Sequence, residues 1–570
     1  MSFTQSIRSE WKTWIPVFLL MLVAAFLRLK LTSDHDYYIL EGDGPYYPLQ
    51  VRSIAEHFRM AMPDMPLTFI IEYLFAKLFQ LSTSNSFDEC ILMGIRFTDA
   101  FIPPLAAIPV FLISQEVKPA DAKNNFYLYL IVGFAILNFT PALVFAHCIH
   151  KNAVAVVWVF YYLLFIIRFI KYSEKKYLYR AILFLALCAL THFGSFSILF
   201  LFSSLAGLIW LWRNRAALSP ADHKKIVVIL VCLTVFICTI AFFDFGRFKR
   251  LISIPLNIFE APLIVYGIKW QSLPYSIMMP NLIVVYLLFI MALIARSRNR
   301  KNLDDLERSM FDTFLVITFL MINPLLGIDW ANRSYLMAYI PLTILYFMFF
   351  TIVKKQWKKI LTTVVFLVIL YYPAGSIIIG NNMGILSKDS FSEFQSIGTK
   401  INFSKNSAII SNRELRLLAS WVFRTKSAAD YTLTKEDLKR FDTVYFLRQI
   451  KGEQFHNIED NVPINSSLVY QGNYFEVYKL SGLDQWTIGK GQTPRIRGFI
   501  KSIDQNKITI FNKFTGHHRI AELSDRTVIH LSEGDTVLKK GMYVEVWGKG
   551  KPFSITIDVE KIIGNKYLIK

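Results

Sequence analysis

The chain has 570 residues, of which 54% are hydrophobic and 18% are charged, and its formal net charge is +20. A soluble globular protein has roughly 25% charged residues, so this composition favours an integral membrane protein. The positive charge does not indicate a nucleic-acid-binding protein, because many Lys and Arg residues fall in short loops between apolar runs. None of the five cysteines lies beyond residue 380, and the chain has no CxxC pair, which excludes a disulfide framework and a cysteine-based metal site.

Apolar runs long enough to cross a bilayer, which takes about 20 residues, recur through the first two thirds of the chain. The loops between them alternate between rich and poor in Lys and Arg, and this positive-inside pattern predicts a cytoplasmic N-terminus. It places everything after residue 380 outside the cytoplasm of a multi-pass plasma (inner) membrane protein. The first run lacks a small-residue cleavage site and is predicted to be a retained span. The predicted spans are 14–30, 92–114, 125–146, 152–171, 179–192, 195–212, 226–244, 275–295, 310–328, 333–353 and 360–379.

The first outer loop, residues 31–91, contains the stretch LEGDGPYYPLQVR, which ends at Arg52. Its Gly-Pro pair predicts a turn, and the proline is suited to the first turn of a helix, so a short amphipathic helix should begin here. Asp43 would then lie at the helix N-terminus, either as a cap or as a functional carboxylate. Upstream, Asp34 and Asp36 form a DHD triplet that can hold a divalent cation through oxygen ligands. Residues 66–81 predict an interfacial helix.

Ionisable residues near the spans indicate a structural or functional role, because placing one ionisable side chain at mid-bilayer costs roughly 3 kcal/mol. Arg96 and Asp99 are three residues apart and are expected to pair along one helix face. The second outer loop, FAHCIHKNA, offers His150 and Lys151. Two histidines without a third ligand do not make a zinc site, whereas a cluster of donors at the membrane surface suits a phosphate. His192 and Arg333 are predicted to face the same side, although each alone can be an interfacial anchor.

Beyond residue 380 the composition becomes that of a soluble protein. Residues 381–485 combine a helical stretch at 411–423 with strand-like runs at 443–447 and 475–480, which predicts a small α/β domain. Residues 486–570 begin with part of a linker and continue with short alternating strands separated by turns, which predicts a small β-barrel resembling OB-like barrels. The basic residues of the barrel can touch anionic lipid, but a solvated β-surface explains them equally well. The strand-like runs are IRGFIKSI, KITIFNKF, TVIHL, YVEVWGKG and SITIDVEKII.

Donors and a carboxylate on the outer side suit transfer of a sugar from a polyprenyl phosphate. Such a reaction needs cations or a metal to stabilise the departing phosphate, and a carboxylate to deprotonate the incoming hydroxyl. With these pieces in place, residues 10–380 resemble the GT-C superfamily of lipid-linked-sugar glycosyltransferases, which includes oligosaccharyltransferase catalytic subunits, protein O-mannosyltransferases and lipid A aminoarabinose transferases. The resemblance rests on the order and spacing of DGPYYPLQVR, IRFTDAFIPPLAAIPVFLIS, LNFTPALVFAHCIHKNAVAVVWVFYYLLF, LALCALTHFGSFSILF and NRSYLMAYIPLTIL.

The apolar runs and the C-terminal patterns together predict a mostly α polytopic membrane protein of about eleven transmembrane helices, with the α/β and OB-like β-barrel domains outside the cytoplasm. The resemblance implies that its membrane part is GT-C-like. It implies an inverting-type glycosyltransferase in which Asp43 matches the family's first-loop catalytic aspartate. Many members carry acidic metal ligands in the second outer loop, where this chain has His150 and Lys151, so Lys151 can stand in for the charge of the metal. A divalent cation, Mg²⁺ or Mn²⁺, stays open as cofactor. No WWDYG-like segment is present, which argues against an asparagine-directed oligosaccharyltransferase.

The predicted function is therefore transfer of a sugar or glycan from a polyprenyl-phosphate donor to a lipid, glycan or protein acceptor on the extracytoplasmic face. Asp43 is the predicted catalytic carboxylate, and Arg52, His150, Lys151, His192 and Arg333 are the predicted phosphate-binding residues. A transporter or flippase is the alternative; it predicts repeated halves and charges at mid-membrane, and neither is found in the sequence. A non-catalytic membrane scaffold that presents the C-terminal domains is a third hypothesis, but it leaves the Asp43 loop unexplained.

Overall fold

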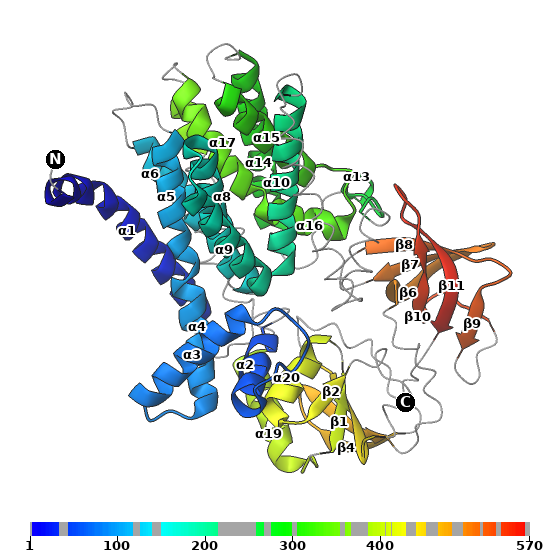
Figure 1. Ribbon diagram of the computed structural model, residues 1–570. Helices are drawn as coiled ribbons and strands as arrows, with labels where there is room; N and C mark the ends of the chain where they lie inside the picture. The colour runs from blue at the N-terminus through cyan, green and yellow to red at the C-terminus, as the bar shows by residue number, and fades with distance from the viewer. Residues whose placement is uncertain are drawn as a thin grey trace.

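The structure is a computed structural model with three parts: a body of helices, a mixed sheet beside the first outer loop, and a β-barrel (Figure 1). The predicted span 226–244 and the first-loop residues 34–43 lie outside the described residues. The structure describes residues 3–33, 44–117, 126–138, 150–214, 258–266, 275–298, 305–353, 359–365, 386–404, 406–411, 413–428, 440–451, 466–480, 494–512, 517–531 and 537–564.

The helical body has a core of large apolar side chains. Phe134, Phe160 and Phe311 are fully buried between its helices, and α17 is buried along almost its whole length. Within the described residues, four helical stretches are long and apolar enough to cross a membrane: Lys12–Lys30, Phe87–Val117, His150–Tyr172 and Ser334–Ile352. The body's helices are α1 (Phe3–Ser33), α5 (Ala107–Val117), α6 (Phe126–Leu137), α8 (His150–Tyr172), α9 (Lys175–Thr191), α10 (Phe193–Asn214), α14 (Tyr275–Arg298), α15 (Asp305–Met321) and α17 (Tyr339–Ile352).

The helix-rich membrane architecture is thus as the sequence predicted, whereas the number of eleven spans stays a prediction. The predicted span 92–114 is not one regular helix. It consists of the end of α4 (Phe87–Phe101), the short 3₁₀ helix η1 (Pro103–Ala106) and α5. Pro103 and Pro104 lack N–H donors and interrupt the α-helical ladder, which explains the change of geometry.

The first outer loop folds into two helices that pack on the start of α4. α2 (Tyr46–His57) begins after Pro45, and α3 (Leu67–Ser82) occupies the stretch predicted as an interfacial helix. Both predicted helices are therefore present, while the position of α3 at the bilayer surface stays a prediction. α3 and α4 approach closely at Gly94, where a Cβ atom would lie 2.6 Å from the carbonyl oxygen of Glu72. A larger residue there would push the two helices apart.

The mixed sheet has five strands in the order β2-β1-β3-β5-β4, with β1 parallel to β2 and β3, and β5 antiparallel to β3 and β4. The predicted helix near 411–423 and the strands at 443–447 and 475–480 are present. The other three strands of this sheet, β1, β2 and β4, were not predicted. The elements are α19 (Lys388–Lys400), β1 (Ser407–Ile410), α20 (Arg413–Phe423), β2 (Lys426–Ala428), β3 (Thr443–Gln449), β4 (Ser466–Gln471) and β5 (Phe475–Leu480).

The C-terminal strands close into a barrel, in which β6, β7, β8, β11 and β10 pair in turn and β10 pairs back with β6. β9 is added to β11 in parallel. The predicted small barrel is present, and its likeness to OB barrels stays a prediction. β8 was not predicted because HHRIAE contains a single β-branched residue, Ile520, and none of Phe, Tyr or Trp. The strands are β6 (Ile496–Asp504), β7 (Lys507–Asn512), β8 (His517–Glu522), β9 (Val528–Leu531), β10 (Tyr543–Gly550) and β11 (Thr556–Gly564).

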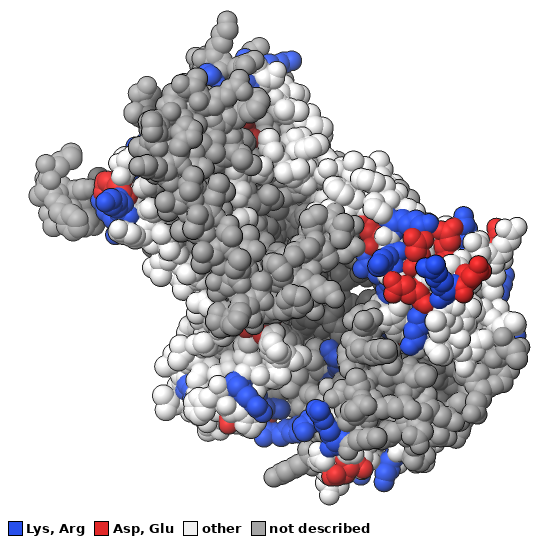
Figure 2. Space-filling model, turned by 45° about the vertical axis from the view of Figure 1, so that its right-hand side comes forward, with Lys and Arg blue, Asp and Glu red and all other residues white. Residues whose placement is uncertain are grey.

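Charged side chains gather on the barrel with both signs intermixed, whereas the described part of the helical body is mostly uncharged on the same face (Figure 2). On the barrel, Lys551 lies 2.5 Å from Glu522 and 3.0 Å from Asp558. Such neutralised pairs are typical of a solvated β-surface rather than of a basic patch that recruits anionic lipid. The solvated-surface explanation of the barrel's basic residues is therefore preferred.

The first outer loop and the mixed sheet share one hydrophobic core. Tyr47, Val51 and Phe69 of the loop belong to the same buried cluster as Phe394 of α19 and Phe475 of β5. Burial of side chains from both parts stabilises the loop against the sheet, since each large apolar side chain contributes roughly 1.5–3 kcal/mol. The loop is therefore held by the mixed sheet as well as by α4.

Candidate functional site

The N-terminus of α8 packs against α2, so that the second outer loop meets the first. The backbone N–H of Lys151 donates to the hydroxyl of Tyr47 at 3.2 Å, and the ring of His150 stacks on the Tyr47 ring at 4.4 Å between centroids. The ammonium of Lys151 contacts the carboxylate of Asp64 and lies 5.3 Å from the centre of the Tyr46 ring. His150 and Lys151 thus lie against the wall formed by the first loop, and their predicted role in phosphate binding stays a prediction.

Asp64 was not predicted from the sequence, yet it is the carboxylate of the described residues that lies closest to this cation. It accepts hydrogen bonds from the Tyr46 hydroxyl and from the backbone N–H of Met65, the latter at 2.7 Å. Burial alone would raise the pKa of the Asp64 carboxyl, but the Lys151 ammonium and these hydrogen bonds outweigh it and hold the pKa below its ordinary value. The one feature of the sequence that could have indicated Asp64 is its position between two Met-Pro pairs, MPDMP, where each proline interrupts regular structure.

Gln50 fixes the loop that carries Asp64. Its side-chain amide donates to the Tyr46 hydroxyl at 2.7 Å and to the carbonyl of Met62 at 2.9 Å, and its oxygen accepts from the Met62 N–H at 3.2 Å. Gln50 is completely buried. One face of α2, with Tyr46, Tyr47 and Gln50, therefore builds the wall on which Lys151 rests.

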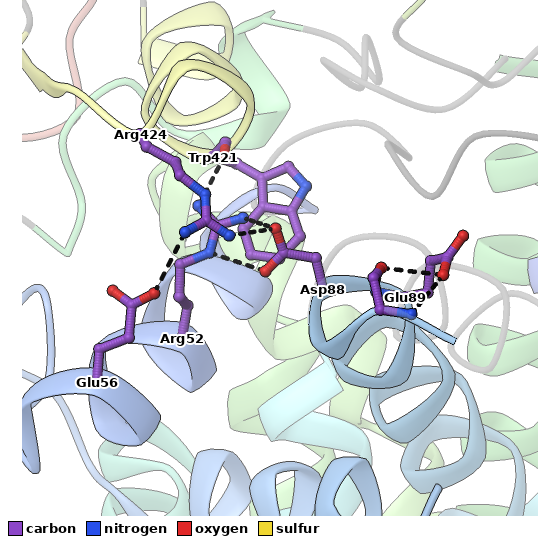
Figure 3. Close-up of polar contacts among 7 residues, drawn as sticks. Arg52, Glu56, Asp88, Glu89, Trp421 and Arg424 are labelled. Carbon is purple, nitrogen blue, oxygen red and sulfur yellow. Dashed lines mark hydrogen bonds and ion pairs between the residues drawn. The ribbon is translucent and has the colours of Figure 1, made fainter. Parts of the chain in front are cut away.

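The guanidinium of Arg52 lies between Asp88 and Trp421 (Figure 3). Its guanidinium binds both carboxylate oxygens of Asp88, at 3.2 and 2.9 Å, donates to the carbonyl of Trp421 at 2.7 Å, and stacks 3.5 Å from the centre of the Trp421 ring. Arg424 of the sheet region binds the same Asp88 at 2.8 Å and also lies 3.7 Å from Glu56. The guanidinium of Arg52 thus joins α2 to α20 instead of reaching Lys151.

His192 lies at the junction of α9 and α10. Its Nδ1 accepts a hydrogen bond from the backbone N–H of Ser195 at 3.0 Å, which caps the first turn of α10. Because Nδ1 is the acceptor, the neutral ring carries its proton on Nε2, the nitrogen that can donate to an anion. This side-chain capping role was not predicted.

The remaining predicted site residues are only partly described. Arg333 lies in α16 (Ile328–Met337), whose backbone is described but in which the Arg333 side chain is not. Asp34, Asp36 and Asp43 lie outside the described residues. The described residues thus bring together His150 and Lys151, assign Arg52 to a different contact, and leave the position of the predicted catalytic carboxylate as a prediction.

The expected pairing of Arg96 with Asp99 is wrong. Asp99 binds Arg28 of α1 instead: Arg28 Nε donates to the backbone carbonyl of Asp99 at 2.6 Å, and Nη2 to its carboxylate at 2.5 Å. Both side chains are buried, and two hydrogen bonds to one neighbouring helix outweigh a pair along a single helix face.

Beside Arg28 lies a cavity of about 30 Å³ that Asn138 also lines. A space of this size holds about one water molecule.

A further buried carboxyl, Glu72 of α3, lies near enough to Asp99 and Lys151 for both charges to act on it. Burial, and to a smaller extent the charge of Asp99, raise the pKa of Glu72 well above its ordinary value, while Lys151 opposes the shift. Among the residues that the structure describes, neither carboxylate oxygen of Glu72 has a hydrogen-bond partner. Such a group is stable in its neutral form, since an ionised carboxylate without partners is costly to bury.

The described residues do not fit a divalent-cation site. They contain no group of three or more His, Cys, Asp or Glu side chains with the spacing of metal ligands. Asp64, the carboxylate nearest the second outer loop among them, is already bound by an ammonium and a phenol. Asp34 and Asp36 lie outside the described part of the chain, so no step is assigned to a metal.

No protein-family model matches the sequence, and neither does any curated protein. The fold is similar to that of the apo oligosaccharyltransferase of Archaeoglobus fulgidus, with a TM-score of 0.52, 13% identity, and coverage of 78% of this chain and 70% of that chain. It is also similar to ArnT from Cupriavidus metallidurans bound to undecaprenyl phosphate, with a TM-score of 0.50, 11% identity, and coverage of 81% of this chain and 97% of that chain. These similarities confirm the predicted distant GT-C resemblance at the level of the fold.

Proposed function

We propose that this protein is a multi-pass membrane glycosyltransferase that transfers a sugar or glycan from a polyprenyl-phosphate donor to an acceptor on the extracytoplasmic face. The observation that carries the proposal is the Lys151 ammonium, held at the N-terminus of α8 against the first outer loop. A helix N-terminus and a cation together favour an anion such as a phosphate. ArnT, whose fold is similar, was solved with undecaprenyl phosphate, which supports the same class of donor here.

The proposed reaction is an inverting displacement. The acceptor hydroxyl loses its proton to Asp43, its oxygen forms a bond to the anomeric carbon of the sugar, and the bond from that carbon to the phosphate oxygen breaks. The electron pair of the broken bond leaves with the polyprenyl phosphate, whose charge His150, Lys151, His192 and Arg333 stabilise. Preorganised donors of this kind act on charge as it develops, so they lower the barrier without moving during the reaction.

Arg52 takes a different role in this proposal from the one predicted from the sequence. Its guanidinium is committed to Asp88 and to the Trp421 carbonyl and is buried. Burial, more than any other influence, lowers the pKa of Arg52, and Asp88 opposes that shift. We therefore assign Arg52 to the docking of the mixed sheet on the first outer loop, and the donor phosphate to the cations on the other outer loops.

The test is sugar transfer by the purified protein from polyprenyl-phosphate-linked sugars, comparing the wild type with Asp43→Asn at matched protein levels. Asn caps a helix about as well as Asp, so a capping role tolerates the change. Loss of general-base catalysis lowers the rate by about 10²–10⁴-fold. Glu89→Gln, an exposed carboxylate of the same loop that bonds to Ser86, is the matched control and should keep most of the activity. Transfer by Asp43→Asn at the wild-type rate would remove Asp43 from the mechanism, and absence of transfer by the wild type with all donors would favour the transporter or scaffold hypotheses.

A further inference from the structure

The short segment 258–264 is paired on both sides by parts of the chain that are distant in sequence. On one side the carbonyl of Phe259 accepts from the N–H of Phe553 at 2.9 Å, and the N–H of Ala261 donates to the carbonyl of Ser554 at 3.0 Å. The rings of Phe259 and Phe553 also stack, with centroids 5.1 Å apart. The segment is therefore docked on the turn between β10 and β11 of the C-terminal barrel.

The other side of the segment holds the start of α16. The carbonyl of Ile258 accepts from the N–H of Gly327 at 2.6 Å, and the N–H of Leu263, the first residue of α13 (Leu263–Tyr266), donates to the carbonyl of Leu326 at 2.9 Å. Gly327 is the N-cap of α16, and its own carbonyl accepts from the N–H groups of Trp330 and Ala331. A Cβ at Gly327 would lie 2.3 Å from the Glu260 carbonyl oxygen, so the contact requires glycine. α13 and α16 lie beside the barrel in Figure 1.

Glu260 is the centre of this arrangement, which we name the Glu260 clamp: residues 258–264 with Arg495 and Arg519. The Glu260 side chain is 3% exposed, and its carboxylate binds both arginines, with Arg495 Nε at 3.0 Å from Oε1. Arg519 of β8 also donates through Nε to the carbonyl of Ile555 at 3.0 Å, which fixes the direction of its guanidinium. A Cβ at Gly550 would lie 1.7 Å from the Glu260 carboxyl carbon, so the barrel leaves room for this side chain.

The clamp makes the docking of the barrel specific. A buried carboxylate is costly unless it is paired, and both cations that pair with Glu260 come from the barrel. Glu260 is therefore stable in its buried position only while the barrel is docked. Since the same segment bonds to the N-cap of α16, the position of the first turn of α16 depends on the barrel as well.

We propose that the C-terminal barrel is a positioning module: through the Glu260 clamp it fixes the start of α16 and so the backbone position of Arg333, in the second turn of that helix. The proposed function assigns Arg333 to the donor phosphate. Glu260, Arg495 and Arg519 are then positioning residues. The inference rests on the proposed function for the role of Arg333, whereas the docking of the barrel is independent of it. It gives the C-terminal barrel a role in donor binding even though it lies outside the helical body.

The first arm of the test measures docking without any sugar transfer. Phe259→Cys and Phe553→Cys are introduced together into the full-length chain, with its five natural cysteines replaced, and disulfide formation is followed in the presence and absence of Glu260→Gln. The expected result is several-fold slower cross-linking with Glu260→Gln, and the wild-type rate with the control Asp504→Asn, an exposed carboxylate on the barrel. Equal rates with Glu and Gln at position 260 overturn the clamp, whatever the outcome of the transfer assay.

The second arm measures donor kinetics with the purified full-length protein. Glu260→Gln should raise the donor KM by roughly 10- to 100-fold, as for other small misplacements of a binding group, while kcat changes far less. Oxidation of the Cys pair in the Glu260→Gln background should restore the donor KM, which a folding defect would not allow. The double variant tests whether both residues act through the same contact.

In combination with Arg333→Met, Glu260→Gln should raise the donor KM no further. Independent, multiplicative increases of the donor KM, or an unchanged donor KM in Glu260→Gln, overturn the positioning role. Absence of transfer by the wild type overturns the proposed function and, with it, the role of Arg333, while the first arm still decides the docking.

Discussion

The ammonium of Lys151 contacts the carboxylate of Asp64, 87 residues earlier in the chain. The contact joins the N-terminus of α8 to the first outer loop, and it leaves both side chains partly accessible, at 14% and 19% exposed. Under the proposed function, this exposure leaves the ammonium open to a phosphate. Asp64 then holds the cation in place before the ligand arrives, which lowers the entropic cost of binding.

The first prediction is that Lys151→Met weakens donor binding. A charge-assisted hydrogen bond contributes about 1.5–3 kcal/mol, so the donor KM should rise by roughly 10- to 100-fold. Lys171→Met is the matched control, since Lys171 lies at the opposite end of α8 and pairs with Glu116. The measurement is initial transfer rate against donor concentration for both variants. An equal donor KM for Lys151→Met and Lys171→Met would show that Lys151 does not bind the phosphate.

The second prediction concerns the contact of the first outer loop with the mixed sheet. Arg52→Met removes a buried guanidinium that binds Asp88 and stacks on Trp421, so it should destabilise the docked sheet by about 2 kcal/mol. Arg424→Met removes the other partner of Asp88, but this side chain is 61% exposed, and the loss should be below about 1 kcal/mol. The urea concentration at which residues 386–480 become susceptible to a protease pulse measures both. Equal losses for the two variants would contradict the ranking.

Local sequence patterns were sufficient to predict those helices and strands whose structure is decided by residues nearby in the sequence. The Gly-Pro break before Tyr46 correctly predicted the start of α2, and the alternation in YVEVWGKG correctly predicted β10 with its bounds. β8 was not predicted because its own residues give little indication of a strand, although it pairs with the preceding strand β7 as well as with the distant β11. Pairing with neighbouring strands decides its structure more than its own propensity does.

The site depends on contacts that a single sequence does not reveal. Arg52 was predicted to bind phosphate from its place in the first outer loop, yet its partner Trp421 is 369 residues away. Asp99 was paired with Arg96 because the two share a helix face, while its actual partner, Arg28, lies on another helix. In both cases the buried charge makes more than one hydrogen bond to parts of the chain outside its own helix, and tertiary packing decides which these are.

The third prediction concerns orientation in the membrane. If the N-terminus is cytoplasmic, a cysteine introduced at Ser297 should be protected from an impermeant thiol reagent in intact cells, and one at Asn506 should react. Both positions are exposed in the structure, so the difference reports the membrane barrier rather than burial. The five natural cysteines are replaced first, and permeabilised cells, in which both positions should react, provide the control. Reaction at 297 together with protection at 506 would reverse the orientation.

The last prediction concerns the pH dependence of stability at Glu72. Because the pKa of this buried carboxyl is raised in the folded protein, mainly by burial and then by Asp99, the unfolded chain ionises first as the pH rises. The contribution of Glu72 to the free energy of unfolding is therefore fully present below pH 4.5, the ordinary pKa of the group. It is lost as the pH rises from there to the raised pKa of the folded protein, by up to about 1.4 kcal/mol per pH unit.

Glu72→Gln keeps the size of the side chain and cannot ionise, so it should be more stable than the wild type at pH 8, with a smaller difference at pH 5. Glu72→Asp, which keeps a carboxyl in the same position on α3, should retain the pH dependence even if its packing is poorer. The measurement is the urea midpoint of the purified protein across this pH range for all three proteins. Parallel profiles for the wild type and Glu72→Gln would mean that Glu72 has a partner that stabilises its charge, and that the buried carboxyl beside Lys151 is ionised in the folded protein.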